Sequence, residues 1–347
     1  MKIKVIFIMS LFFSMSMILS AKIVPLDGLF KPESITVGGN YIYIVDFPVI
    51  YILNKADFCL VKKFGRIGEG PQEFSQFAAT FPHKNELIIC DMVKSLFYSL
   101  DGNYKKEIRV SDFIWRELTP AGDKFVGKSR FNEGKTDTIA LNIYNANLKF
   151  EKRLVKYKMW KMDNILDYRN IQFATYKDKI FIKPFENKFA LDVYDTTGEK
   201  LYSINRDYEK VEVTDTDIQR YHNYFKNYSR VRKNYEDIRS KLKFADTFPA
   251  IQTFTVADEK IYVVTYKKKD LNSEVLVLDL KGKLLKTLYL PLFKNDEVFY
   301  RSIENNIFRR KNNSTFAINN GKLYQILENE DKETWELHIT NFDPGKR

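Results

Sequence analysis

The chain has few of the side chains that build most metal and redox sites. Its 347 residues include only two cysteines, Cys59 and Cys90, and three histidines, His83, His222 and His338. The histidines lie far apart, and neither an HExxH motif nor a closely spaced cysteine pair is present. A GxSxG motif, which would mark a nucleophilic serine, is also missing. We therefore predict no metal and no cofactor.

Glycine and proline are also scarce, with 14 and 10 residues, which argues against a long disordered linker. The chain has one long apolar run, at 5–19, preceded by two lysines and followed by Ser20 and Ala21. This order is typical of a secretory signal, here 1–21. The alternative is an uncleaved membrane anchor, although the run is near the short end of the about 17–25 residues that span a bilayer. We favour cleavage and export, which leaves no stable membrane span.

Export would permit a disulfide between the two cysteines. We expect Cys59 near the start of an outer strand and Cys90 within a strand of the next sheet. Positions of this kind are too far apart for a bridge, whose Cα atoms lie within about 7 Å. We therefore predict two buried free thiols.

The charge of the chain is basic, with 56 Lys and Arg against 45 Asp and Glu. Such a surplus is found in proteins that bind nucleic acid, anionic lipid or acidic glycan. Most of the lysines are scattered along the chain, and an exported protein rarely meets nucleic acid. We expect a dispersed surface charge and no nucleic-acid partner.

A repeat of alternating strands that end in polar turns runs through the chain. Its copies are VIYILNKADF, SLFYSLDGNY, ALNIYNANLKF, ALDVYDTTGEK and VLVLDLKGK. Aligning them at Leu53, Leu100, Tyr144, Tyr194 and Leu278 gives spacings of 47, 44, 50 and 84 residues. Each turn has Asn, Asp or Gly where a tight hairpin needs them.

Each copy follows another β-rich run, which we interpret as an inner strand. These runs are 41–46, 86–91, 123–129, 179–185 and 260–266, and a sixth, 322–327, is followed by 334–340. A period of about 45 residues with several strands per unit is that of a β-propeller blade. The sequence predicts an all-β chain, 22–347, that forms one six-bladed β-propeller. The sixth blade lacks an outer strand, and KIVPL at 22–26 is placed to supply it and close the ring.

The stretch GRIGEGPQEF, 65–74, joins the first two repeats and is called the connector below. It lacks the Gly-Lys-Ser/Thr ending and the following helix of a phosphate-binding loop. We interpret it as a crossover between two sheets in which Phe74 fills the contact between them, and a nucleotide site is the alternative.

The connector also resembles a known signature. Its pattern of Phe64-Gly65, Gly68-Glu69-Gly70-Pro71 and Glu73-Phe74 is similar to the inter-blade signature of exported bacterial six-bladed β-propellers related to NHL repeats. Only one good copy is present. The resemblance implies the same six-bladed fold, and a location in the periplasm or on the surface of a bacterium.

The spacing of 84 residues indicates an insertion between blades 4 and 5. At 214–243, apolar residues recur every three or four positions, which predicts amphipathic helices that begin at Thr214 or Asp215. The polar side is basic and carries Arg220, Lys226, Arg230, Arg232, Lys233, Arg239, Lys241 and Lys243. This helical insertion is either a flap with a solvated basic side or a docking arm for an anionic partner.

Asp46 and Asp91 end two of the β-rich runs at equivalent positions. Carboxylates of this kind usually cap turns by accepting hydrogen bonds from backbone amides. As an alternative, a pair of them in neighbouring blades could bind a cation or act as acid and base.

These observations favour a non-enzymatic binding module, present as a monomer, that binds a protein or a glycan in the cell envelope. The predicted binding residues are Arg66, Glu69, Tyr221, Tyr224 and Arg232, on one face of the propeller. The alternative is an enzyme, a lyase or hydrolase with a metal in the central channel. A third hypothesis is a scaffold that sits near anionic lipid.

Overall fold

The computed structural model describes residues 21–75, 78–91, 94–109, 114–158, 171–184, 188–227, 235–240, 242–292 and 316–342. Residues 1–20, which hold nearly all of the predicted signal, lie outside this description.

The described chain forms six four-stranded antiparallel sheets, the blades of a β-propeller. Blade 1 contains β2 (Ser34–Gly38), β3 (Tyr41–Asp46), β4 (Val49–Asn54) and β5 (Leu60–Phe64). Blade 2 contains β6 (Ala79–His83), β7 (Glu86–Cys90), β8 (Lys94–Ser99) and β9 (Tyr104–Arg109). Blade 3 contains β10 (Ile114–Ala121), β11 (Lys124–Glu133), β12 (Thr136–Tyr144) and β13 (Phe150–Lys158). Blade 4 contains β14 (Gln172–Tyr176), β15 (Lys179–Lys183), β16 (Phe189–Asp195) and β17 (Lys200–Arg206). Blade 5 contains β18 (Thr253–Ala257), β19 (Lys260–Lys269), β20 (Asn272–Asp279) and β21 (Leu284–Leu290). Blade 6 contains β22 (Phe316–Asn319), β23 (Lys322–Asn329), β24 (Thr334–Asn341) and β1 (Ala21–Leu26).

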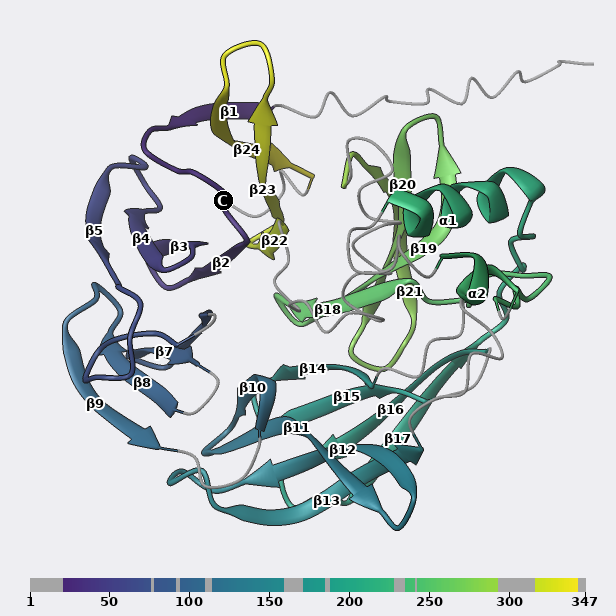
Figure 1. The fold of residues 1–347 in the computed structure, drawn as a ribbon, viewed down its shortest axis with the longest axis horizontal. Coiled ribbons are helices and arrows are strands. Elements are labelled where there is room, and N and C mark those ends of the chain that lie inside the picture. The colour runs from purple at the N-terminus through teal and green to yellow at the C-terminus, as the bar shows by residue number, and fades with distance from the viewer. Residues whose placement is uncertain are drawn as a thin grey trace, which may run out of the picture.

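The first strands of neighbouring blades contact one another around a closed ring, from β2 through β6, β10, β14 and β18 to β22 and back to β2 (Figure 1). The runs that we predicted as inner strands are therefore the second strands of their blades, and this part of the prediction is wrong. Three of the true innermost strands, β2, β14 and β22, have only four or five residues and no alternating burial, which leaves little pattern to recognise.

The predicted closure is confirmed. β1 pairs antiparallel with β24, from Ala21 opposite Thr340 to Leu26 opposite Trp335, and forms the outer strand of blade 6. The ring is thus closed by strands from opposite ends of the described chain, and blade 6 has no missing strand.

In blades 3, 4 and 5 the polar turns between the third and fourth strands share one geometry. Asn145, Asp195 and Asp279 each accept hydrogen bonds from the amides two and four residues later, at 2.8–3.1 Å. These are side-chain capped turns, which explains the recurrence of Asn and Asp there. The turn in blade 2 follows Tyr98, which takes the place of Leu53 in blade 1, so aligning Leu100 was wrong by two residues.

The apolar core lies mostly in the contacts between neighbouring blades, called seams here. Phe74 is fully buried in the seam of blades 1 and 2, among Tyr43, Ile52, Leu87 and Leu96. The prediction that it fills this contact is confirmed. The two cysteines are both free, but only Cys90 is buried, and the prediction of a buried Cys59 is wrong. Cys59 precedes an outer edge strand, which is open to solvent.

Two short helices, α1 (Asp215–Asn227) and α2 (Tyr235–Arg239), lie in sequence between β17 and β18. Thr214 caps α1, because its hydroxyl accepts from the amide of Asp217, whose carboxylate accepts in return from the Thr214 amide. Residues 228–234 and 241 lie outside the described chain, so the helical part shown is shorter than the predicted stretch. Within the described residues, no helix is long and apolar enough to cross a bilayer.

Candidate functional site

The structure does not bring the predicted binding residues together. Arg66 and Glu69 lie in the connector between blades 1 and 2, on the opposite side of the ring from α1 (Figure 1). Tyr221 of α1 is only 4% exposed and packs inside a cluster with Phe225, so its ring is not presented to a partner. The side chain of Tyr224 and all of Arg232 lie outside the described part of the chain.

The connector uses its amides internally. Gly68 donates to the carbonyl of Phe74 at 3.0 Å, Phe74 donates to that of Arg66 at 2.9 Å, and Gly70 donates to the Glu73 carboxylate at 2.8 Å. Arg66 also forms an ion pair with Glu73 at 2.8 Å. A phosphate-binding loop needs these amides free to face the ligand. The connector therefore uses these three amides for its own crossover, as the structural interpretation predicted.

Glycine is required at the start of the connector. Gly65 has φ of +119°, and a Cβ built there would lie 2.2 Å from the carbonyl oxygen of Pro48. Farther along, the buried Lys94 of β8 donates to the carbonyl of Gly70 at 2.5 Å, and this fastens the connector to blade 2.

Asp46 and Asp91 hold backbone, as the capping interpretation predicted. Asp46 accepts from the amides of Phe30 and Lys31, both at 2.7 Å, and Asp91 accepts from the amide and hydroxyl of Ser75 at 3.1 and 2.9 Å. In both blades the bonded amide lies 16 residues before the aspartate. The segment that leads into blade 1 is thus bonded to Asp46 in the same way as the connector is bonded to Asp91. The sequence pattern alone did not reveal this second copy.

The histidines serve separate parts of the fold. His83 bonds the carbonyl of Gly122 at 3.0 Å, His338 bonds Glu336 at 2.8 Å, and His222 packs near the ring of Phe244. Across the described ranges, no three His, Cys, Asp or Glu side chains are grouped closely enough to hold a metal ion.

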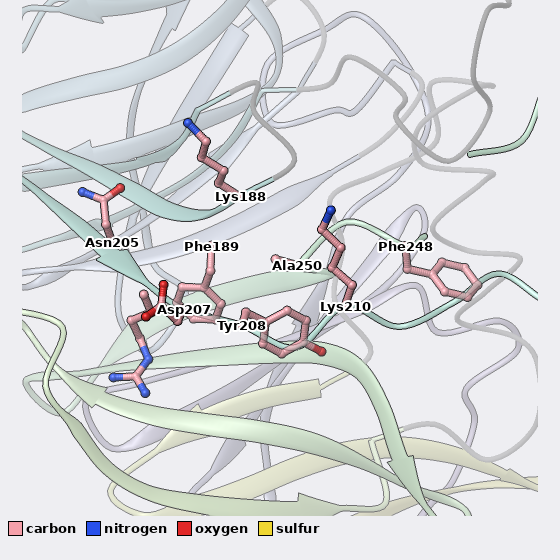
Figure 2. A pocket seen from close by; sticks show the side chains of 9 residues that line it. Lys188, Phe189, Asn205, Asp207, Tyr208, Lys210, Phe248 and Ala250 are labelled. Carbon is pink, nitrogen blue, oxygen red and sulfur yellow. The ribbon is translucent and has the colours of Figure 1, made fainter. Parts of the chain in front are cut away.

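A pocket of about 410 Å³ lies at the seam of blades 4 and 5 (Figure 2). It is lined by Lys188, Phe189, Asn205, Arg206, Asp207, Tyr208, Lys210, Phe248 and Ala250. This volume is within the usual range for small-ligand sites, about 300–1,000 Å³. The pocket, rather than the predicted face, is therefore the candidate site.

The floor of the pocket is aromatic. Phe189 and Phe248 are 2% and 6% exposed, and the half-buried ring of Tyr208 lies 5.9 Å from that of Phe189. Phe248 is in turn stacked on Tyr266 of β19 at 4.4 Å. Burial raises the pKa of Tyr208 above its usual value of 10.0. Tyr208 therefore keeps its proton to a higher pH than a solvent-exposed tyrosine does.

The rim of the pocket is cationic. Lys188, Arg206 and Lys210 line it, against the single carboxylate of Asp207. Arg206 donates to the carbonyl of Gly282 at 3.5 Å, and no carboxylate among the described residues pairs with Arg206 or Lys210. In Figure 2 the side chain of Lys188 lies above Phe189 and that of Lys210 lies between Tyr208 and Phe248, with both amino groups directed to the same side. The uncompensated charge favours an anionic ligand.

The chain segments at the base of the helices build one wall of the pocket. The amide of Phe248 donates to the carbonyl of Val211 at 2.8 Å, and that of Val213 donates to Asp246 at 2.9 Å. Tyr221, Phe225, Tyr235 and Phe248 form one buried cluster, so both helices pack on the residue that lines the pocket. The sequence pattern did not reveal this site, although aromatic residues flank the predicted insertion on both sides and basic residues precede it.

No protein-family model and no curated protein matches the chain. Among solved structures, it is similar to the WD40 domain of Neurospora crassa Pan2, with 9% identity and a TM-score of 0.41 over 91% of this chain and 76% of that one. It is also similar to Kluyveromyces lactis Hsv2, with 11% identity and a TM-score of 0.34 over 89% and 86% of the two chains. Likeness this loose carries no argument about function, and the six-bladed fold rests on the strand topology.

Proposed function

We propose that the chain is a non-enzymatic binding module whose binding site is the pocket at the seam of blades 4 and 5. The observation that carries this proposal is a cationic rim over an aromatic floor, with Arg206 and Lys210 unpaired within the described chain. A partner with negative charge, on a protein or a glycan, fits such a rim. The helices α1 and α2 act as the docking arm, because their aromatic residues share a buried cluster with Phe248 beside the pocket.

The proposal includes export from a bacterium to the periplasm or cell surface, where the partner belongs to the cell envelope. Its support is the basic, apolar and small-residue order of 1–21 and the resemblance of the connector to exported NHL-like propellers. The channel-metal alternative gains no support from Asp46 and Asp91, because both carboxylates already hold backbone amides.

A comparison of three immobilised proteins tests the binding site: the mature chain, a double variant Arg206→Gln with Lys210→Gln, and the control Lys149→Gln. Lys149 is an exposed lysine of blade 3, outside the pocket. We expect the mature chain and the control to retain an envelope component at low salt. The double variant should not retain this component. Equal retention by all three proteins would show that the pocket is not the binding site.

A further inference from the structure

The pocket is lined by cations, a carboxylate and an amide, a mixture that a ligand with negative charge alone would not require. Arg206 and Lys210 are cations without a carboxylate partner in the described ranges, and Asp207 is an exposed carboxylate for which the same ranges supply no cation. Asn205 adds an amide, which both donates and accepts hydrogen bonds. A simple anion would be attracted by the cations and repelled by Asp207. A ligand that carries both a carboxylate and hydroxyl groups uses all of them.

We propose that this pocket binds a carboxylated sugar, a uronic acid unit of an acidic glycan. This proposal rests on the proposed function above and names its ligand class. Arg206 binds the sugar carboxylate, since the planar guanidinium matches a carboxylate with two parallel hydrogen bonds. Lys210 adds a second positive charge, and Asp207 and Asn205 accept hydrogen bonds from sugar hydroxyls.

The aromatic floor supports the same ligand. Tyr208 supplies a half-buried ring, which lies 5.9 Å from the buried ring of Phe189 and has the ammonium of Lys267 5.3 Å from its centroid. The hydroxyl oxygen of Tyr208 is itself buried, so the pocket meets the ring and not the hydroxyl. A pyranose has an apolar face of C–H groups that packs on an aromatic ring, whose face is electron-rich. The volume of about 410 Å³ accommodates one or two sugar units.

A substitution at Asp207 distinguishes this proposal from binding by positive charge alone. If the ligand is held only by positive charge, then Asp207→Ala removes a repulsion and strengthens binding. If Asp207 accepts hydrogen bonds from hydroxyls, then the same change weakens binding. The direction of this single effect therefore distinguishes an acidic sugar from an acidic peptide or another anion.

Isothermal titration calorimetry on the mature chain tests the proposal with three probes: a galacturonic acid trimer, a neutral galactose trimer and a short oligoglutamate. We expect the uronate to bind and the neutral sugar to bind at least about tenfold more weakly. Arg206→Gln and Asp207→Ala should each weaken uronate binding by about tenfold or more. The exposed control Lys149→Gln should leave uronate binding unchanged.

Stronger uronate binding by Asp207→Ala would overturn the proposal. Binding of oligoglutamate in preference to the uronate would also overturn it, while the binding module and its site would stand. If no probe binds but an envelope component is still lost from the Arg206→Gln and Lys210→Gln protein, the sugar proposal alone fails. If no probe binds and all immobilised proteins retain envelope components equally, both the sugar proposal and the proposed function fail.

Discussion

Asp46 fastens the loop that leads from the closing strand β1 into blade 1, and replacing it with alanine should destabilise the propeller. The carboxylate is 7% exposed and accepts two amide hydrogen bonds at 2.7 Å, from Phe30 and Lys31. A hydrogen bond to a charged group contributes about 1.5–3 kcal/mol. Water can reach the freed amides, because residues 30 and 31 are exposed, so we expect a loss of about 3 kcal/mol for both bonds together.

The assay is urea unfolding followed by circular dichroism, with the free energy taken at an unchanged slope. Asp46→Asn keeps one acceptor oxygen and should lose about half as much. The control Asp57→Ala removes a carboxylate that accepts a single amide bond in an exposed turn, and should cost about 1 kcal/mol or less. A loss no greater for Asp46→Ala than for Asp57→Ala would refute the reasoning, since the two buried amide bonds would then contribute nothing.

Three other predictions follow from burial. Phe74→Ala should cost about 3–5 kcal/mol in urea unfolding, and the partly buried Leu29→Ala should cost less; equal losses would contradict a seam filled by Phe74. Burial lowers the pKa of His83 below its usual 6.5, so the unfolded chain binds a proton more readily and stability falls as the pH drops through this value. His83→Gln should flatten that part of the stability profile, and an unchanged profile would exclude His83 as its cause. Burial raises the pKa of Cys90 to about 12, so a thiol reagent should label only Cys59 in the folded protein, and labelling of both thiols before unfolding would contradict the buried position.

The sequence predicted the blades because their second and third strands carry strong signals. Buried alternating runs and Asn or Asp turns recur at a nearly constant period, and each turn residue satisfies the same backbone amides. The innermost strands were misplaced, because they are short and only partly buried and local pattern does not distinguish them from loops.

The candidate site could not be predicted in the same way. Its residues come from 188–189, 205–210 and 248–250, and only the pairing at the base of the helices brings the last two groups together. The burial of Tyr221 bears on the predicted binding face. Tyr221 lies on the apolar side of its helix, which is the side expected to face the core, so the helical pattern already argued against Tyr221 as a binding residue.

The pairing of β1 with β24 also has a consequence for how the molecule folds. Ala21 and Thr340 lie at almost the greatest sequence separation that the described chain allows, so this contact is among the least local in the fold. Hairpins within blades 1 to 5 form between neighbours in sequence, whereas the circle is completed only after its last strand has been made. Until then β1 has no partner and the sheet of blade 6 has an open edge, the state in which such chains are most prone to aggregate. The pairing of β1 with β24 therefore makes closure of the ring depend on the strands of blade 6.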